Sequence, residues 1–206
     1  MKRRVVGSCN LRAMIRGFSS RRSFGALVSC AAFALAAFVS GCGPSTPALR
    51  PLPAYSGRMA SLFDDGIDAT AVGLTGDRKA YQPKYDPDFR ERAQTADGVV
   101  VVKVTTVSAK AESSGTSYVL GCHVEKKLAG AHPPDDTFEL HVASGGPASG
   151  ILKNLDSKVV GMKFVAFVRA FVRPDGDTET HFHFAADSKD VSEASTDATT
   201  ILDGEK

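Results

Sequence analysis

His181-Phe182-His183 places two imidazoles two residues apart. Residues two apart on a β-strand point to the same face, so both rings could bind one metal ion. His123 and His141 also lie opposite apolar neighbours in strand-like segments and could supply a third ligand. The alternatives are solvent-facing histidines, or a polar patch whose charge changes near neutral pH. His181 and His183 are thus the candidate metal ligands, and a metal-binding protein or enzyme centred on them is one hypothesis.

Other chemically suggestive segments have simpler explanations. Residues 64–68, Asp-Asp-Gly-Ile-Asp, lack the alternating acids and the distal glutamate of a calcium loop, which favours a capped turn. Residues 144–150 are glycine-rich, but no Gly-Lys-Ser/Thr follows to form a phosphate loop. Cys122 alternates with apolar residues, which predicts a buried, unreactive thiol. We therefore assign no catalytic residue.

Val39-Ser40-Gly41-Cys42 ends an apolar run that begins at Gly25 and follows a basic, acid-free segment. A positive region, a short apolar region and small residues at the cut are the parts of a secretory signal. The run is shorter than the roughly 20 apolar residues that a spanning helix needs. This segment resembles the lipobox of bacterial lipoproteins. The alternative is a short transmembrane anchor that is never cleaved.

The resemblance implies that Cys42 becomes the mature N-terminus and carries covalent lipid, a diacylglycerol thioether and an acyl chain such as palmitate on its amine. Two or more acyl chains anchor a protein stably, so membrane lipid is the expected partner. Because Gly43 and not aspartate follows Cys42, the pattern favours the outer over the inner membrane of the bacterial envelope. Residues 20–24, Ser-Arg-Arg-Ser-Phe, resemble the twin-arginine export motif but lack its leucine and lysine. Both that route and general secretion stay open.

Cleavage before Cys42 would change the chain's charge. The full chain has 25 basic and 23 acidic residues, and seven of the basic residues but none of the acidic ones precede Cys42. The mature chain would therefore carry 18 basic and 23 acidic residues, a net charge of −5. A mildly acidic domain is a poor nucleic-acid binder, because such binding depends on neutralising phosphates. Cys122 would be its only free thiol, so no internal disulfide is expected.

Composition divides the chain into five parts: a signal peptide (1–41), a proline-rich tether (42–55), a helix-leaning extension (56–96), a β core (97–187) and a C-terminal helix and tail (188–206). In the extension, Asp86-Pro87 predicts the start of a short helix. In the last part, Asp187-Ser188 can cap a helix with Val191, Ala194, Ala198 and Ile201 on one side.

The β core has five strand-like segments and one helical segment. The strands are expected at 99–107, 118–125, 138–142, 163–172 and around 181–184, with a polar turn at 109–116 and a helix at 151–156. This order predicts a mainly β (β-rich α+β) fold, a five-stranded antiparallel OB-like barrel with short flanking helices. An antiparallel β-sandwich is the alternative.

In layout, the β core resembles the OB-like module of netrin C-terminal and tissue-inhibitor domains. Three segments carry the likeness: Ala96-Asp97-Gly98-Val99-Val100, Leu128-Ala129-Gly130 and Val160-Gly161-Met162-Lys163-Phe164. Those modules have disulfides, whereas this chain has no paired cysteines after Cys42, so the resemblance implies a fold and not metalloproteinase inhibition. The leading hypothesis is a lipid-anchored, non-catalytic binding or structural module of the cell envelope. Its partner would be an envelope protein or a small ligand, with no cofactor and no nucleic acid.

Overall fold

The computed structural model describes residues 51–74 and 82–203, which belong to one compact unit of the chain. In chain order its helices and strands are α1 (Gly57–Leu62), β1 (Gly66–Ile67), the 3-10 helices η1 (Ala69–Val72) and η2 (Pro83–Tyr85), α2 (Pro87–Thr95), β2 (Gly98–Glu112), β3 (Gly115–Ala129), β4 (Thr137–Val142), α3 (Ser149–Val159), β5 (Lys163–Val172), β6 (Thr178–Ala186) and α4 (Lys189–Asp203).

The strands form one six-stranded sheet in the order β1-β6-β5-β2-β3-β4. All neighbours are antiparallel except β1, which runs parallel to β6. The predicted β-rich α+β class is confirmed, and α3 interrupts the five long strands where an OB-like layout requires a helix. The sheet differs from a closed five-stranded barrel by its sixth, very short strand and by the missing ladder between β4 and β6. A sandwich would need two sheets, and the described strands form only one.

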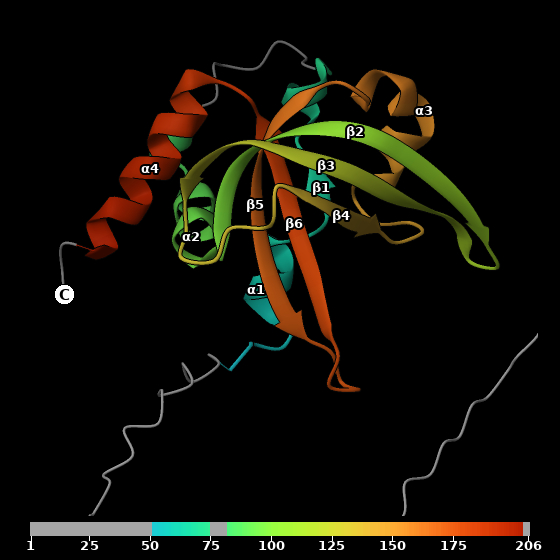
Figure 1. Ribbon diagram of the computed structural model, residues 1–206, viewed down its shortest axis with the longest axis horizontal. Helices are drawn as coiled ribbons and strands as arrows, with labels where there is room; N and C mark the ends of the chain where they lie inside the picture. Colours follow the sequence, from blue (N-terminus) through green and yellow to red (C-terminus); the bar gives the residue numbers. More distant parts are fainter. Residues whose placement is uncertain (1–50, 75–81, 204–206) are drawn as a thin grey trace, which may run out of the picture. The chain divides into compact units, whose positions relative to one another are not determined.

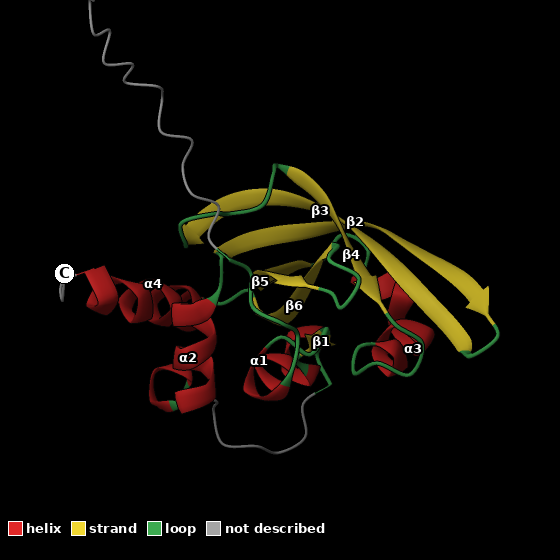
Figure 2. Ribbon diagram, turned by 90° about the horizontal axis from the view of Figure 1, so that it is seen from below, coloured by secondary structure: helices red, strands yellow, loops and turns green. Residues whose placement is uncertain are grey.

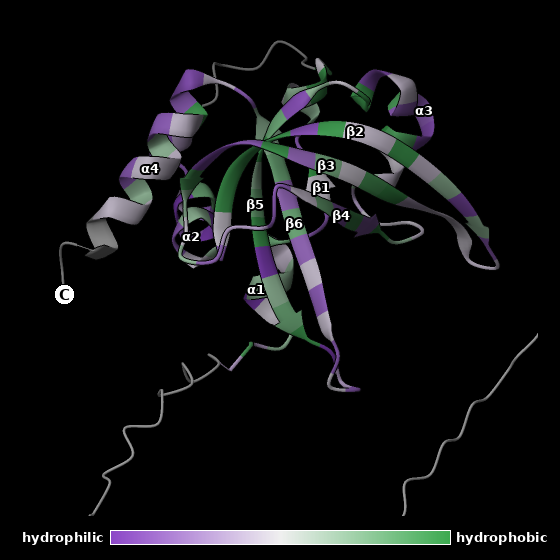
Figure 3. Cartoon of the chain, in the orientation of Figure 1, coloured by the Kyte–Doolittle hydropathy of each residue, from purple (hydrophilic) through white to green (hydrophobic). Residues whose placement is uncertain are grey.

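Both faces of the sheet are buried at the start of β2, as its unbroken valine run predicts. Val99 and Val101 pack with α1, α2 and α4, on what we call the outer face. Val100, Val102 and Val104 pack with β3, β4 and α3, on the inner face. Figure 2 shows α2 and α4 together at one end of the sheet and α3 at the other. β5, largely hydrophobic along its length in Figure 3, contributes to both clusters.

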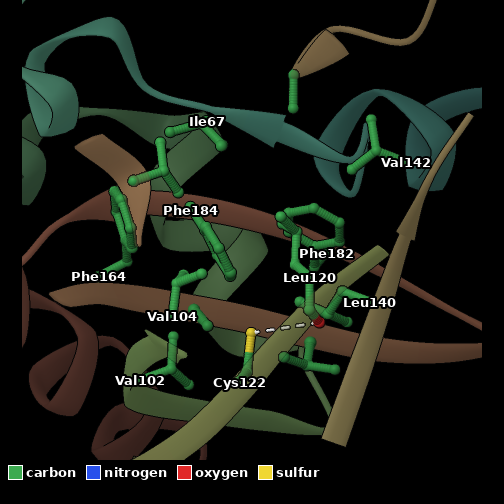
Figure 4. Packing of buried hydrophobic residues seen from close by; sticks show 14 of the residues in the cluster. Ile67, Val102, Val104, Leu120, Cys122, Leu140, Val142, Phe164, Phe182 and Phe184 are labelled. Carbon is green, nitrogen blue, oxygen red and sulfur yellow. Dashed lines mark hydrogen bonds between the residues drawn. The ribbon is translucent and has the colours of Figure 1, made fainter. Parts of the chain in front are cut away.

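Cys122 belongs to the inner-face cluster, among Leu120, Leu140 and Phe182 (Figure 4). Its side chain is buried, and its sulfur lies 3.9 Å from the Leu120 carbonyl oxygen. Burial raises the pKa of the thiol to about 12, because the thiolate is poorly solvated there. The predicted burial of Cys122 is confirmed, and the raised pKa agrees with the expected low reactivity.

The helix starts follow the expected capping chemistry. The Asp86 carboxylate accepts hydrogen bonds from the main-chain N–H groups of Asp88 and Phe89, at 2.9 and 3.3 Å, and Pro87 occupies the first helical position of α2. At α4, the Ser188 hydroxyl accepts from the Val191 N–H at 3.3 Å. Val191, Ala194 and Ala198 are buried on one side of that helix.

The polar turn predicted at 109–116 is wrong. β2 continues to Glu112 and β3 restarts at Gly115, so only residues 113–114 form the turn. The polar side chains there are exposed because this end of the hairpin extends beyond the core, as Figure 1 shows. Polar composition therefore marked a solvent-exposed pair of strands and not a break in them.

Candidate functional site

The loop between α1 and η1 lies against β6, and this contact brings two of the sequence's suggestive segments together. The Asp65 N–H donates to the Phe182 carbonyl oxygen at 2.9 Å, and the Asp68 N–H donates to the Phe184 carbonyl oxygen at 2.8 Å. Between them, Gly66 and Ile67 form β1. The acid-rich loop therefore serves as a short edge strand, and its carboxylates reach the histidines of β6.

His181 lies between two carboxylates. Its Nδ1 atom is 2.8 Å from Asp65 Oδ2, and its Nε2 atom is 3.1 Å from Glu179 Oε1, an ion-pair distance without hydrogen-bond alignment. The ring stacks on Tyr55, with centroids 3.4 Å apart and parallel planes. Only 14% of the His181 side chain is exposed.

His183 is enclosed in the same way but by different partners. Its Nδ1 atom lies 2.8 Å from Asp64 Oδ1, and its Nε2 atom lies 3.1 Å from Asp68 Oδ1. Its side chain is 10% exposed. We refer to the two rings and their carboxylates as the histidine clamp, which consists of Asp64, Asp65, Asp68, Glu179, His181 and His183.

The clamp favours charged imidazoles. Burial alone would lower the pKa of both histidines, but hydrogen bonds to the carboxylates outweigh it, so both pKa values lie above the usual 6.5. Burial acts to raise the pKa of Asp64, yet the hydrogen bond and charge of His183 bring it below its usual value. At Asp65 burial dominates over His181, and the carboxyl pKa is raised. A protonated ring can donate from both nitrogens: His183 has an acceptor at each, and His181 has one at Nδ1 with the Glu179 carboxylate near Nε2.

The local fold of residues 64–66 positions the Asp64 carboxylate. Asp64 Oδ1 accepts from the Gly66 N–H at 3.1 Å, which is the capped turn that the sequence predicts. A Cβ atom at Gly66 would lie 2.6 Å from that same oxygen. Asp65 has a positive φ of 53°, a left-handed conformation that aspartate tolerates better than most residues. Glycine at position 66 therefore leaves room for the carboxylate that binds His183.

The end of the predicted tether contacts the domain beside the clamp. The Val172 N–H donates to the Pro53 carbonyl oxygen at 3.0 Å, and the Tyr55 hydroxyl donates to the Phe63 carbonyl oxygen at 2.8 Å. Burial, followed by the negative charges of Asp65, Asp64 and Glu179, raises the pKa of Tyr55 to about 12. Residues 53–55 are thus fixed to the sheet.

A cleft of about 650 Å³ opens next to His181, between β4 and the β5–β6 hairpin. We call it the seam cleft, since it lies where a closed barrel would join β4 to β6. One wall includes Glu112 at the end of β2, Ser117 of β3, and Glu139 and His141 of β4. The wall on the β6 side includes Asp65, Arg173, Thr178, Glu179, Thr180 and His181. Figure 1 shows β4 running away from β6 toward the tip of the β2–β3 hairpin. His181 therefore belongs to both the clamp and the cleft.

The structure separates the four histidines that the sequence offers as ligands. His181 and His183 share a face of β6, as predicted, but they share no partner. His141 lines the seam cleft in an exposed position, and His123 is exposed on β3 away from it. Within residues 51–74 and 82–203, no group of three or more His, Cys, Asp or Glu side chains has the arrangement of a metal site. The expectation of solvent-facing histidines is wrong, because the 64–68 loop covers both rings.

Sequence reasoning missed the pairing of the 64–68 loop with β6. The loop and the histidines are more than 110 residues apart, and neither segment alone indicates the other. The available signal was an acid-rich turn and a histidine pair in one chain. An acid-rich turn and a histidine pair can neutralise each other's charge when they come into contact.

Val39, Ser40, Gly41 and Cys42, which the sequence predicts to be a lipobox, lie outside the described residues. In the part of the chain that is described, no helix is long and apolar enough to cross a membrane. Comparisons with protein-family models, with curated proteins and with solved structures find no match for this chain.

Proposed function

We propose that this protein is a lipid-anchored component of the bacterial envelope that acts as a non-catalytic binding module. The observation that carries the proposal is the sequence Val39-Ser40-Gly41-Cys42 at the end of a signal-like apolar run. Cys42 would carry the lipid, with the outer membrane favoured over the inner.

Binding is favoured over catalysis by the state of the reactive side chains. Three of the four ring nitrogens of His181 and His183 hydrogen-bond to carboxylates, and the fourth, His181 Nε2, is buried 3.1 Å from Glu179 Oε1, an arrangement that favours protonated rings over a base or a metal ligand. The Cys122 thiol is buried with a pKa of about 12, which makes it a poor nucleophile. The seam cleft, in contrast, presents polar groups to solvent in a volume typical of ligand sites.

The anchor is tested by Cys42→Ala in full-length protein expressed in a Gram-negative host. We expect loss of the lipid mass, accumulation of the uncleaved precursor and loss of the outer-membrane fraction on a density gradient. Cys30→Ala is the matched control, because it removes another cysteine of the same segment and should leave processing unchanged. Normal cleavage, lipid mass and fractionation of Cys42→Ala would overturn the anchor.

Metal analysis of the purified full chain tests the proposal of a non-catalytic binding module against the metal-binding or enzymatic alternative. We expect less than 0.1 equivalent of zinc or copper, with or without substitution of the histidines. Stoichiometric metal that is lost in the His181→Ala/His183→Ala double variant, but kept in His123→Ala, would instead support the metal-binding or enzymatic alternative.

A further inference from the structure

The two edges that border the seam cleft have unused main-chain groups. β4 is the last strand of the sheet and pairs only with β3. β6 pairs with β1 only at His183 and Phe184, and the Asp65 main chain reaches Phe182. Nearer the start of β6, Thr178 and Thr180 line the cleft. An open strand edge is a template for pairing with another extended chain.

The pairing register of β3 and β4 shows which β4 residues direct their main-chain N–H and C=O groups away from β3, toward the cleft. The Val124 N–H of β3 donates to the Asp136 carbonyl oxygen at 2.8 Å, so even-numbered residues from Asp136 onward face β3. Because main-chain groups alternate sides along a strand, those of Glu139 and His141 face outward. Both residues line the cleft. β4 thus presents about 20 Å of free edge over its six residues.

The side chains around this edge favour a positively charged occupant. Four carboxylates line the cleft, from Asp65, Glu112, Glu139 and Glu179, against one guanidinium and two imidazoles. Glu179 lies 3.6 Å from Arg173 and Asp65 binds His181, so these two carboxylates are already compensated. Glu112 accepts only a hydroxyl hydrogen bond from Ser117, at 2.7 Å. Glu112 and Glu139 are therefore the carboxylates available to an incoming cation.

We propose that the seam cleft binds an extended peptide segment rich in lysine or arginine, which adds to β4 as a further strand. This inference rests on the proposed binding function and names the class of its partner. Main-chain pairing with β4 supplies affinity, while Glu112 and Glu139 select basic side chains at alternate positions of the peptide. Segments of a basic envelope protein have this chemistry, whereas a nucleic acid or an acidic peptide would be repelled.

The test uses full-length protein in detergent and a fluorescent hexapeptide of alternating lysine and valine, followed by anisotropy. We expect saturable binding, with at least tenfold weaker binding of the glutamate–valine analogue. A lysine–valine peptide that is N-methylated at alternate residues should also bind at least tenfold more weakly, because it cannot complete the ladder. Spermidine should compete poorly, since it carries charge without a peptide main chain.

Variants locate the site. The double variant Glu112→Gln/Glu139→Gln should weaken lysine–valine binding at least fivefold, and Glu193→Gln on the exposed face of α4 is the matched charge control, expected within twofold of the parent. His141→Pro removes an outward main-chain donor that β3 does not use, and it should weaken binding at least tenfold while His141→Ala changes it less than threefold. Circular dichroism and thermal midpoints establish that each variant is folded.

Several results would overturn the proposal. These are absence of binding, equal affinity for the N-methylated or acidic peptide, or an equal loss in Glu193→Gln. If His141→Pro does not fold, the N-methylated peptide still decides whether main-chain pairing matters. If peptide binding fails while Cys42 is lipidated normally, only the proposed partner is rejected and the anchored module stands. If Cys42→Ala is still processed, lipidated and fractionated normally, the anchor is rejected, whatever the peptide result.

Discussion

The two edges of the sheet are treated in opposite ways. At β6, the chain's own 64–68 loop pairs with the strand, and two buried histidines bind its carboxylates. At β4, no described segment covers the outer side, and exposed polar residues border an open cleft. The β6 edge is covered at residues 182–184 by the paired loop and its ion pairs, whereas β4 is open along its outer side. At the β6 edge, main-chain pairing is accompanied by ion pairs between the loop and the strand, whereas the outer side of β4 has no such partner among the described residues.

The largest effect should follow from removing the more buried clamp ring. His183→Ala leaves two carboxylates without their partner, and loss of one partner of a buried pair costs about 3 kcal/mol in the free energy of unfolding. Urea titration would measure it. His123→Ala, at an exposed position of β3, is the matched control and should lie within about 0.5 kcal/mol of the parent. Equal stability of the two variants would remove the distinction between the edges.

Gly66→Ala should weaken the contact between the 64–68 loop and β6 without replacing a charged residue. The added Cβ would occupy the space of Asp64 Oδ1 and displace it from His183, at an expected cost of about 2 kcal/mol. Gly176→Ala is a useful comparison, since its Cβ would meet nothing within 4 Å and only its positive φ of 91° would be strained. The sharper measurement is the His183 proton titration by NMR, because only Gly66→Ala should lower that pKa.

The pH dependence of the protein's stability should reveal how much the histidine clamp contributes to it. The pKa values of His181 and His183 are raised on folding, so their contribution is complete below about 6.5, the unfolded value, and is lost as pH rises through the folded values. The lowered pKa of Asp64 makes its contribution disappear as pH falls below about 3.8, while Asp65 acts in the opposite direction. We expect the denaturation midpoint to decline from pH 6 to pH 9. A double His181→Asn/His183→Asn variant should flatten that decline.

Tyr55→Phe should have a smaller effect on the same edge. It removes the hydroxyl bond to the Phe63 carbonyl oxygen, worth about 1 kcal/mol, but keeps the stack on His181. Tyr55→Leu should lose about 1 kcal/mol more, because the aromatic contact also disappears. Both values come from the same urea titrations, and equal losses would mean that the stack adds nothing.

The smallest change in stability is expected at the open edge. Glu139→Gln alters an exposed side chain on β4 and should shift the free energy of unfolding by less than about 0.5 kcal/mol. A loss comparable to that of Tyr55→Phe would show that Glu139 supports the fold, contrary to the role inferred for the cleft.

Local patterns in the sequence anticipate most elements of this fold but not its site. The valine run of β2, the alternation around Cys122 and the cap at Asp86 are short-range signals, and the structure confirms each of them. The placement of Asp64 and Asp65 beside β6 depends on the global path of the chain, which no period or cap encodes. The same holds for the cleft, because composition does not reveal which strand edge remains free.

The attachment of Pro53 and Tyr55 has a mechanical consequence. A pull on the chain from the N-terminal side would first load the Pro53–Val172 hydrogen bond and then the Tyr55–His181 stack. His181 also lines the cleft, so tension on the tether and occupancy of the cleft would act on the same side chain. If the chain is anchored and the cleft occupied as proposed, strain would pass between the anchor and the bound peptide through a single imidazole.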